Sequence, residues 1–196
     1  MLRVLYLHGL GSSGHSKTVS DLRRELENTY GGEVELIAPT YTPESAQAWR
    51  NYIDVADKCD VVVGTSLGGY HALKLAEHCI NAYYVVVNPC YDPREMLRKY
   101  VGQDLPNYSD PDALGDRFTD SDRRRFEPLE FGQVHKPITW IIGENDAVID
   151  PGAQRAFAIE HVGCELIHTS WGHRVEDANY LANKIINSAD YPFYQF

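Results

Sequence analysis

Six short runs of apolar residues, rich in Val, Ile and Tyr, recur along the chain and are separated by more polar stretches. They occupy residues 3–7, 34–38, 60–64, 83–87, 138–142 and 164–168. The apolar character of each run is continuous rather than alternating, which is typical of strands that are covered on both faces. The pattern therefore predicts a sheet of about six strands, flanked by helices.

Between these runs the apolar residues fall at helical spacing. The segments 19–30 and 46–56 each place four apolar residues on one face of a helix. Thr42, followed by Pro43 and Glu44, is a start signal for the second of these helices. Further helices are expected from Ser66 to about Cys79, over 152–161 and over 176–187. Because strands and helices alternate, we expect an α/β fold with a parallel sheet and right-handed crossovers.

Residues 90–136 interrupt this alternation with charges, prolines and tyrosines. The segment is too long for a simple crossover. We expect one or two short helices and irregular loops that form a small cap beside the carboxyl edge of the sheet, where active sites of such folds lie. Tyr91, Tyr100 and Tyr108 are available there as pocket walls; a solvated loop with half-buried tyrosines is the alternative. The prediction is one domain over residues 1–196, with 90–136 as an insertion.

The stretch Gly64-Thr65-Ser66-Leu67-Gly68 fits the pattern GxSxG, directly after a predicted strand and directly before a predicted helix. Such a sharp turn forces the serine into a strained conformation, and side chains at the two glycine positions would collide with the neighbouring strand and helix. The serine is then held above the sheet edge, where the positive end of the helix favours an oxyanion. The motif also arises in ordinary glycine-rich turns, so its meaning depends on partner residues.

A serine hydroxyl becomes a nucleophile when a general base takes its proton, and an acid orients that base. Asp146 follows the fifth predicted strand and His173 follows the sixth. The order Ser, Asp, His is the one that α/β-hydrolases use. Glu144 and Asp150 are the local alternatives for the acid. His168 is the alternative base, although on its strand we expect a structural histidine with satisfied hydrogen bonds.

The first predicted strand ends in His8-Gly9-Leu10-Gly11. The backbone N–H of Leu10 is our candidate for one half of an oxyanion hole, and the N–H of Leu67 is our candidate for the other half. His8 precedes the nucleophile in the chain, so we expect it to brace this loop through hydrogen bonds rather than to act as the base.

The composition limits the partners. Lys and Arg total 18 against 28 Asp and Glu, and the resulting net charge of −10 repels a phosphate backbone, which argues against nucleic acid. No run reaches the roughly 20 apolar residues of a membrane span, and the N-terminus carries no cleavable signal pattern. The four cysteines lack CxxC spacing and are expected to be buried free thiols. We therefore expect a cytoplasmic protein without a metal or cofactor; its oligomeric state stays open.

Several of these motifs together resemble the YqiA/YcfP-like small bacterial esterases of the α/β-hydrolase superfamily. The matching stretches, between about residues 4 and 175, are LYLHGLGSS, GTSLGGYHA, VVVNPCYDPREMLRKYVG, GENDAVID and the late GH. The resemblance implies a minimal α/β-hydrolase fold that lacks the first two strands of larger members. It also implies Ser66, Asp146 and His173 at the triad positions and esterase activity on short acyl esters. The chain has TSWGH where the family is glycine-rich, which places Trp171 where it can reshape the acyl pocket.

The leading hypothesis is a serine hydrolase that cleaves short-chain carboxylic esters through an acyl-enzyme. An acyl-CoA thioesterase, a peptidase or C–C hydrolase, and a non-catalytic binding module are the alternatives. The net charge of −10 and the lack of a GxxxxGK[ST] loop predict that neutral esters are better substrates than polyanionic CoA thioesters. A basic rim formed by residues 94–99 or 123–125 would reverse that preference.

Overall fold

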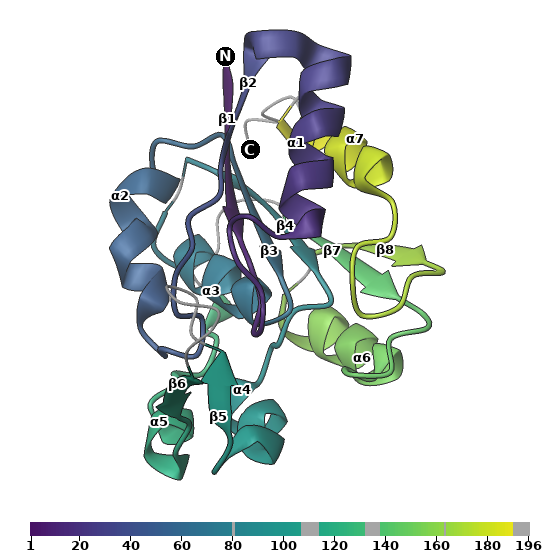
Figure 1. Ribbon diagram of the computed structural model, residues 1–196. Helices are drawn as coiled ribbons and strands as arrows, with labels where there is room; N and C mark the ends of the chain where they lie inside the picture. Colours follow the sequence, from purple (N-terminus) through teal and green to yellow (C-terminus); the bar gives the residue numbers. More distant parts are fainter. Residues whose placement is uncertain (80, 107–113, 132–137, 163, 190–196) are drawn as a thin grey trace.

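A computed structural model of the chain describes residues 1–79, 81–106, 114–131, 138–162 and 164–189 (Figure 1). Six strands form one parallel sheet in the order β2-β1-β3-β4-β7-β8. They are β1 (Leu2–Leu7), β2 (Val34–Ile37), β3 (Val61–Thr65), β4 (Tyr83–Val87), β7 (Ile138–Gly143) and β8 (Glu165–Thr169). Each strand begins and ends within one residue of its predicted run, so the predicted six-stranded parallel sheet is confirmed.

The central strands explain the continuous apolar runs. Every residue of β4 and β7 is buried, as are all residues of β3 except Thr65. The edge strand β8 differs, because Glu165 and His168 are exposed. Burial on both faces therefore removes the alternating pattern from the middle of the sheet, as expected for parallel strands between two helical layers.

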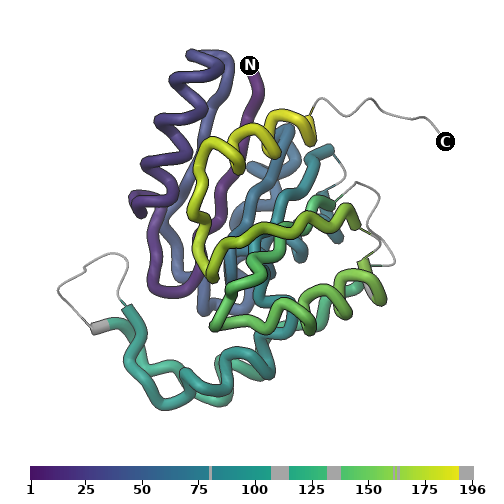
Figure 2. Tube along the Cα trace, turned by 90° about the vertical axis from the view of Figure 1, so that its right-hand side faces the viewer, coloured from purple at the N-terminus to yellow at the C-terminus, as the bar shows by residue number. Residues whose placement is uncertain are grey.

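Helices cover both faces of the sheet. On one face α1 (Lys17–Tyr30) and α7 (Ala178–Ala189) lie side by side, as Figure 2 shows. On the other face lie the 3-10 turn η2 (Ala48–Tyr52), α2 (Ile53–Ala56), α3 (Leu67–Ala76) and α6 (Pro151–His161). A short 3-10 turn, η1 (Gly31–Glu33), leads into β2. The helices predicted around 19–30, 66–79, 152–161 and 176–187 are confirmed.

The helix predicted to start after Thr42 is wrong in its first part. Residues 42–47 form successive turns in which Ser45 N donates to Thr42 O (3.1 Å) and Ala48 N donates to Ser45 O (3.0 Å). Helical structure begins only at Ala48. The carbonyl of Pro43 accepts a hydrogen bond from the buried imidazole of His71, with a Nε2–O distance of 2.7 Å. This tertiary bond to α3 competes with the local helix signal.

Between β4 and β7, the described residues from α4 to α5 lie beyond the carboxyl ends of the strands (Figure 1). It contains α4 (Pro93–Met96), the 3-10 turn η3 (Leu97–Tyr100), β5 (Asp104–Pro106), β6 (Leu114–Arg117) and α5 (Asp120–Arg124). Short helices were expected; the antiparallel pair of β5 and β6 was not. Leu97, Leu105 and Phe126 of this segment pack with Leu67 and Tyr70 of α3, which fixes the segment beside the end of β3.

Within the described ranges, no helix has both the length and the apolar composition needed to cross a membrane. The four cysteines carry free thiols, of which three are buried and that of Cys164 is partly exposed.

Candidate active site

Ser66 joins β3 to α3 in a left-handed backbone conformation, with φ 53° and ψ −122°. A residue with a side chain adopts such a conformation only at a cost of about 1–3 kcal/mol, which the surrounding structure must offset. Ser66 N donates to Val87 O (3.0 Å), and Ser66 O accepts from Cys90 N (2.8 Å). The neighbouring strand β4 and the residues after it therefore hold the strained turn in place.

Two glycines allow the turn to form. A Cβ at Gly64 would lie 2.4 Å from Gly68 O, and a Cβ at Gly68 would lie 2.1 Å from Leu7 O. A Cβ at Gly9 would lie 2.8 Å from the Cβ of Ser66, so the loop after β1 also approaches the serine closely. The predicted steric reason for the GxSxG pattern is confirmed, because side chains at Gly64 and Gly68 would overlap with backbone atoms.

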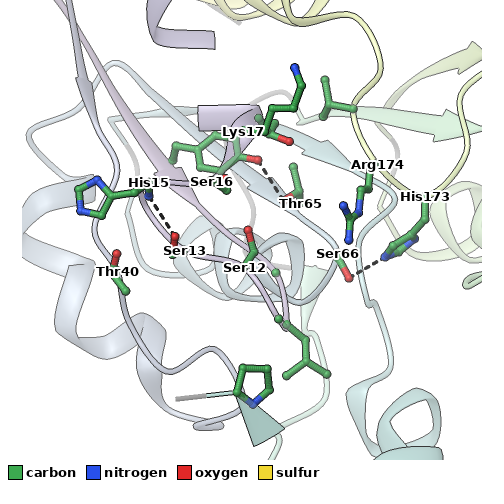
Figure 3. A pocket seen from close by; sticks show the side chains of 17 residues that line it. Ser12, Ser13, His15, Ser16, Lys17, Thr40, Thr65, Ser66, His173 and Arg174 are labelled. Carbon is green, nitrogen blue, oxygen red and sulfur yellow. Dashed lines mark hydrogen bonds between the residues drawn. The ribbon is translucent and has the colours of Figure 1, made fainter. Parts of the chain in front are cut away.

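His173 lies in the loop after β8 and faces both Ser66 and Asp146. Its Nε2 is 3.0 Å from Ser66 Oγ (Figure 3), and its Nδ1 is 2.8 Å from Asp146 Oδ2. An ionised carboxylate only accepts hydrogen bonds, so the imidazole hydrogen belongs on Nδ1 and Nε2 is left to accept from the serine hydroxyl. The structure thus brings together the three residues that the sequence analysis selected, in an arrangement suited to removing the proton of Ser66.

Asp146 is held from the opposite side by backbone groups. Its side chain is fully buried, and Oδ1 accepts from Val148 N (2.7 Å) and Ile149 N (3.0 Å). Burial acts to raise the pKa of Asp146, but the hydrogen bonds from His173, Ile149 and Val148 outweigh it and hold the pKa below its usual value. The carboxylate is therefore ionised at neutral pH and its orientation is fixed.

The competing residues have other partners. Glu144 pairs with His168 (2.5 Å) and Arg155 (3.0 Å), and Asp150 caps α6 by accepting from Ala153 N (2.6 Å). His168 has a hydrogen-bond partner in Glu144, as expected of a structural histidine. It is not an interior residue, however, because its side chain is 41% exposed on the edge strand. Neither Glu144 nor Asp150 contacts His173 by a hydrogen bond among the described residues.

His8 is 1% exposed and braces the loop after β1. Its Nε2 accepts from Tyr41 N (3.3 Å), and its carbonyl accepts from the Tyr41 hydroxyl (2.8 Å). Leu10 follows in the same loop, beside the Gly9 that touches Ser66. Leu67 is the first residue of α3, and the N–H groups of a first helical turn lack partners within the helix. Leu10 and Leu67 therefore stay the candidates for the oxyanion hole.

Asn88 is a positioning residue that the sequence analysis missed. It is fully buried, with φ 44°. Its Nδ2 donates to Gly172 O (2.9 Å) and to His173 O (3.2 Å), and its Oδ1 accepts from Gly143 N (2.8 Å). One side chain after β4 thus joins the loops that carry Asp146 and His173. The sequence signal that could have identified Asn88 is its position directly after a predicted strand, in the run VVVNPCYDPREM.

Two cavities meet at Ser66, and Leu10 and His173 line both. The first, of about 610 Å³, is bordered by the loop after β1 and the start of α1 (residues 9–18), and by Thr40, Thr65 and Arg174 (Figure 3); we call it the polar cavity. The second, of about 330 Å³, lies under the segment 90–100 and against residues 148–150, and we call it the apolar cavity. Tyr91 and Tyr100 line the apolar cavity, as expected of pocket walls; Tyr108 lies outside the described residues.

Trp171 does not shape either cavity, and the expectation that it reshapes the acyl pocket is wrong. Its ring is buried in the core and packs against Tyr180 of α7, with ring centroids 5.6 Å apart. The indole therefore packs on the apolar face of α7 rather than in the site.

In the part of the chain that the structure describes, no group of three or more His, Cys, Asp or Glu side chains is placed to hold a metal ion.

Comparisons with known proteins agree on the fold. A family model described as uncharacterised protein family UPF0227 matches residues 3–189. The structure is similar to Est1E from Butyrivibrio proteoclasticus, with a TM-score of 0.69, 18% identity and coverage of 95% of this chain and 86% of that one. A monoacylglycerol lipase from Paleococcus ferrophilus has a TM-score of 0.65 and 16% identity, with coverage of 95% of this chain and 93% of that one. A Xanthomonas campestris pv. campestris protein assigned to the α/β-hydrolase superfamily has a TM-score of 0.56 and 17% identity, with coverage of 96% of each chain. The fold is that of the α/β-hydrolases.

Proposed function

The chain belongs to UPF0227, the family of YqiA/YcfP-type esterases, and from this premise we propose that it is a serine hydrolase that cleaves short-chain carboxylic esters through an acyl-enzyme. Esterases and lipases among its structural neighbours support hydrolase activity. In this proposal residues 1–196 form one α/β-hydrolase domain, and residues 90–136 are a cap-like insertion whose first part, residues 90–100, walls the substrate cavity.

The observation that carries the proposal is the continuous hydrogen-bonded line from Ser66 through His173 to Asp146. Ser66 Oγ attacks the ester carbonyl carbon while His173 Nε2 takes the hydroxyl proton. The ionised Asp146 stabilises the imidazolium that forms and keeps its ring in place. Without the base, the serine hydroxyl is a poor nucleophile near neutral pH.

The carbonyl oxygen gains a negative charge in the tetrahedral intermediate. The N–H groups of Leu10 and Leu67 are the proposed donors to that oxygen, assisted by the positive end of α3. As the intermediate collapses, the C–O bond to the alcohol breaks and His173 returns the proton to the leaving oxygen. Water then repeats the sequence on the acyl-enzyme, with His173 as the base, and releases the carboxylic acid and free Ser66.

The apolar cavity suits the acyl chain. Met96, Leu97, Tyr91 and Tyr100 line it, and its volume of about 330 Å³ is at the small end of ligand sites. A short acyl group fits such a space. This placement gives the segment 90–136 a direct part in acyl preference, and it predicts that shortening the segment changes relative rates across an acyl series.

Two alternatives use the same scaffold. A thioesterase shares every residue named here, and rates on p-nitrophenyl butyrate and butyryl-CoA separate the two activities because the acyl group is the same. A non-catalytic binding module needs no aligned base, so the complete line of three residues favours an enzyme. The four free thiols fit a reducing, cytoplasmic compartment.

Hydrolysis of p-nitrophenyl esters from acetate to decanoate tests the proposal. The wild-type protein should hydrolyse the short esters fastest, and Ser66→Ala should lose several powers of ten in kcat. Ser20→Ala is the matched control, because Ser20 is exposed on α1 and lines neither cavity. Equal rates for Ser66→Ala and the wild type, with both proteins folded, would contradict the proposal.

A further inference from the structure

Arg174 follows His173 directly and lines the polar cavity together with Ser66. Figure 3 shows its guanidinium extending from the chain beside His173 in the direction of Ser66. Its side chain is exposed to solvent in the cavity and forms no ion pair with a carboxylate of the described residues. A cation next to the candidate base is therefore left to interact with whatever occupies the cavity.

The polar cavity is unusual for so acidic a protein. The chain has a net charge of −10, yet none of the described residues that line this cavity is Asp or Glu. Lys17 also lines it, but Lys17 pairs with Asp21 on α1. The remaining lining is rich in hydroxyl groups, from Ser12, Ser13, Ser16, Thr18, Thr40 and Thr65. Hydroxyl donors beside a guanidinium that has no carboxylate partner in the described part of the chain favour an anionic group over a cationic one.

The basic clusters elsewhere are partly neutralised. Arg98 pairs with Glu95 at 3.0 Å, and Arg125 pairs with Asp122 at 3.5 Å. Asp120 holds Arg123 and Arg124, each at 2.6 Å. Four of the six cations in 94–99 and 123–125 thus have carboxylate partners among the described residues, which weakens the basic rim that the sequence left open. Lys99 is the cation of the apolar cavity, with its Nζ 5.3 Å from the ring centroid of Tyr100.

We propose that the polar cavity binds the alcohol portion of the ester, and that Arg174 pairs there with an anionic group, a carboxylate or a phosphate, carried by that alcohol. This inference rests on the proposed function. Because the ester carbon must lie at Ser66, where the two cavities meet, one cavity receives the acyl chain and the other receives the alcohol. Met96, Leu97 and Ile149 of the apolar cavity suit the acyl chain, whereas the Ser and Thr hydroxyls and Arg174 of the polar cavity suit the alcohol.

The proposal reverses the preference for neutral esters expected from net charge. Repulsion by distant carboxylates is screened over about 8–10 Å at ordinary salt concentrations. A contact between a guanidinium and an anion is screened less, and its forked geometry matches carboxylate and phosphate oxygens. Local pairing with Arg174 therefore outweighs the acidic total for an alcohol with a single anionic group.

Butyrate esters that differ only in the alcohol test the proposal. The alcohols are 2-methoxyethanol (neutral), 3-hydroxypropionate (carboxylate), 2-hydroxyethyl phosphate and choline (cation). Wild-type kcat/KM should be higher for at least one anionic ester than for the neutral one. In Arg174→Gln the anionic-to-neutral ratio should fall about five- to tenfold, mainly through KM, as expected for a partly solvated charge pair. The choline-to-neutral ratio should rise.

Two variants sharpen the comparison. Arg174→Lys keeps the charge but loses the fork, so it should retain part of the anionic preference. Arg24→Gln removes the same charge from the exposed surface of α1, where Arg24 pairs with Asp21 and Glu25, and should leave the ratios unchanged. An effect of similar size in Arg24→Gln would overturn the proposal, because it would show that general electrostatics set the preference.

Unchanged ratios in Arg174→Gln would also overturn it. So would a response confined to monoethyl succinate, which carries the charge on the acyl side, because Arg174 would then face the acyl chain. Binding of 2-hydroxyethyl phosphate and of 3-hydroxypropionate to the Ser66→Ala protein, followed by ligand NMR with and without Arg174→Gln, gives a readout without turnover. Binding of either that depends on Arg174 supports the inference even where ester hydrolysis fails, and failed hydrolysis alone contradicts only the proposed function.

Discussion

Replacing Asp146 with Asn should disable the base while preserving the shape of the site. Asp146 Oδ1 accepts from Val148 N and Ile149 N, and Oδ2 faces His173 Nδ1 at 2.8 Å. In Asp146→Asn these two backbone donors still need an acceptor, so the amide oxygen takes the place of Oδ1 and the NH₂ group faces His173. That group only donates, so the imidazole hydrogen moves to Nε2 and the ring can no longer accept the proton of Ser66.

The expected loss in kcat is about 10⁴-fold, the cost of holding the base in the wrong tautomer. At about 1.36 kcal/mol per tenfold, that corresponds to about 5.4 kcal/mol of transition-state stabilisation. The fold should persist, because the two side chains are nearly the same size. The pKa of Asp146 is lower in the folded protein than in the unfolded chain. The ionised carboxylate therefore stabilises the fold at pH values above the unfolded pKa, and this stabilisation is lost as the pH falls through the folded pKa. The variant should therefore melt at a lower temperature than the wild type at pH 7, and the difference should shrink in acid.

Steady-state hydrolysis of p-nitrophenyl butyrate, with a melting curve for each protein, measures both effects. Asp177→Asn is the matched control: Asp177 accepts from Tyr180 N (2.8 Å) at the exposed start of α7, where asparagine serves equally well. A folded Asp146→Asn protein with kcat within tenfold of the wild type would refute the tautomer argument.

Three further substitutions probe the turn, the loop anchor and the rival histidine. Ser66→Gly should melt about 2–4 °C above Ser66→Ala in scanning calorimetry. Relief of about 1–3 kcal/mol of strain at φ 53°, less about 0.4–1 kcal/mol of added unfolded-state entropy, leaves a gain centred at about 1 kcal/mol. Equal melting temperatures would show that the turn is not strained. Asn88→Ala should lower both the melting temperature and kcat, with KM changed less than kcat, because it releases the loop of His173 and leaves Gly143 N–H unpaired; an unchanged kcat would remove its positioning role. His168→Ala should change rate and stability little, since a surface pair with Glu144 is worth at most about 1 kcal/mol; a thousandfold loss of rate would make His168 the base.

The local sequence was enough for the sheet and for the geometry around Ser66. The runs at 83–87 and 138–142 are buried on both faces, so their apolar pattern carried the whole signal. The glycines at 64 and 68 had a steric meaning that follows from the strand and helix on either side of Ser66. Strand positions and turn geometry that depend on a residue and its neighbours in the chain can be predicted from the sequence alone.

Features that depend on contacts between residues far apart in the sequence could not be predicted from local patterns. The carbonyl of Pro43 accepts a hydrogen bond from His71, 28 positions along the chain, and the helix predicted to start after Thr42 does not form there. The strands β5 and β6 contain no β-branched residue, and their pairing depends on contacts of Leu105 with the segment around it. The direction of Arg174 could not follow from a net charge of −10, because a total says nothing about where each charge lies.

Labelling with a fluorophosphonate probe, followed by mass mapping of the peptides, tests most directly whether Ser66 is an activated nucleophile. Attack by the serine oxygen on phosphorus displaces fluoride, and the serine proton leaves with it, so the peptide that contains Ser66 gains the mass of the probe less that of HF. The wild-type protein should be labelled at Ser66, Ser66→Ala should not be labelled, and His173→Ala should react far more slowly. A folded wild-type protein that fails to react, or equal labelling of Ser66→Ala, would contradict the assignment of Ser66, His173 and Asp146 as one catalytic unit.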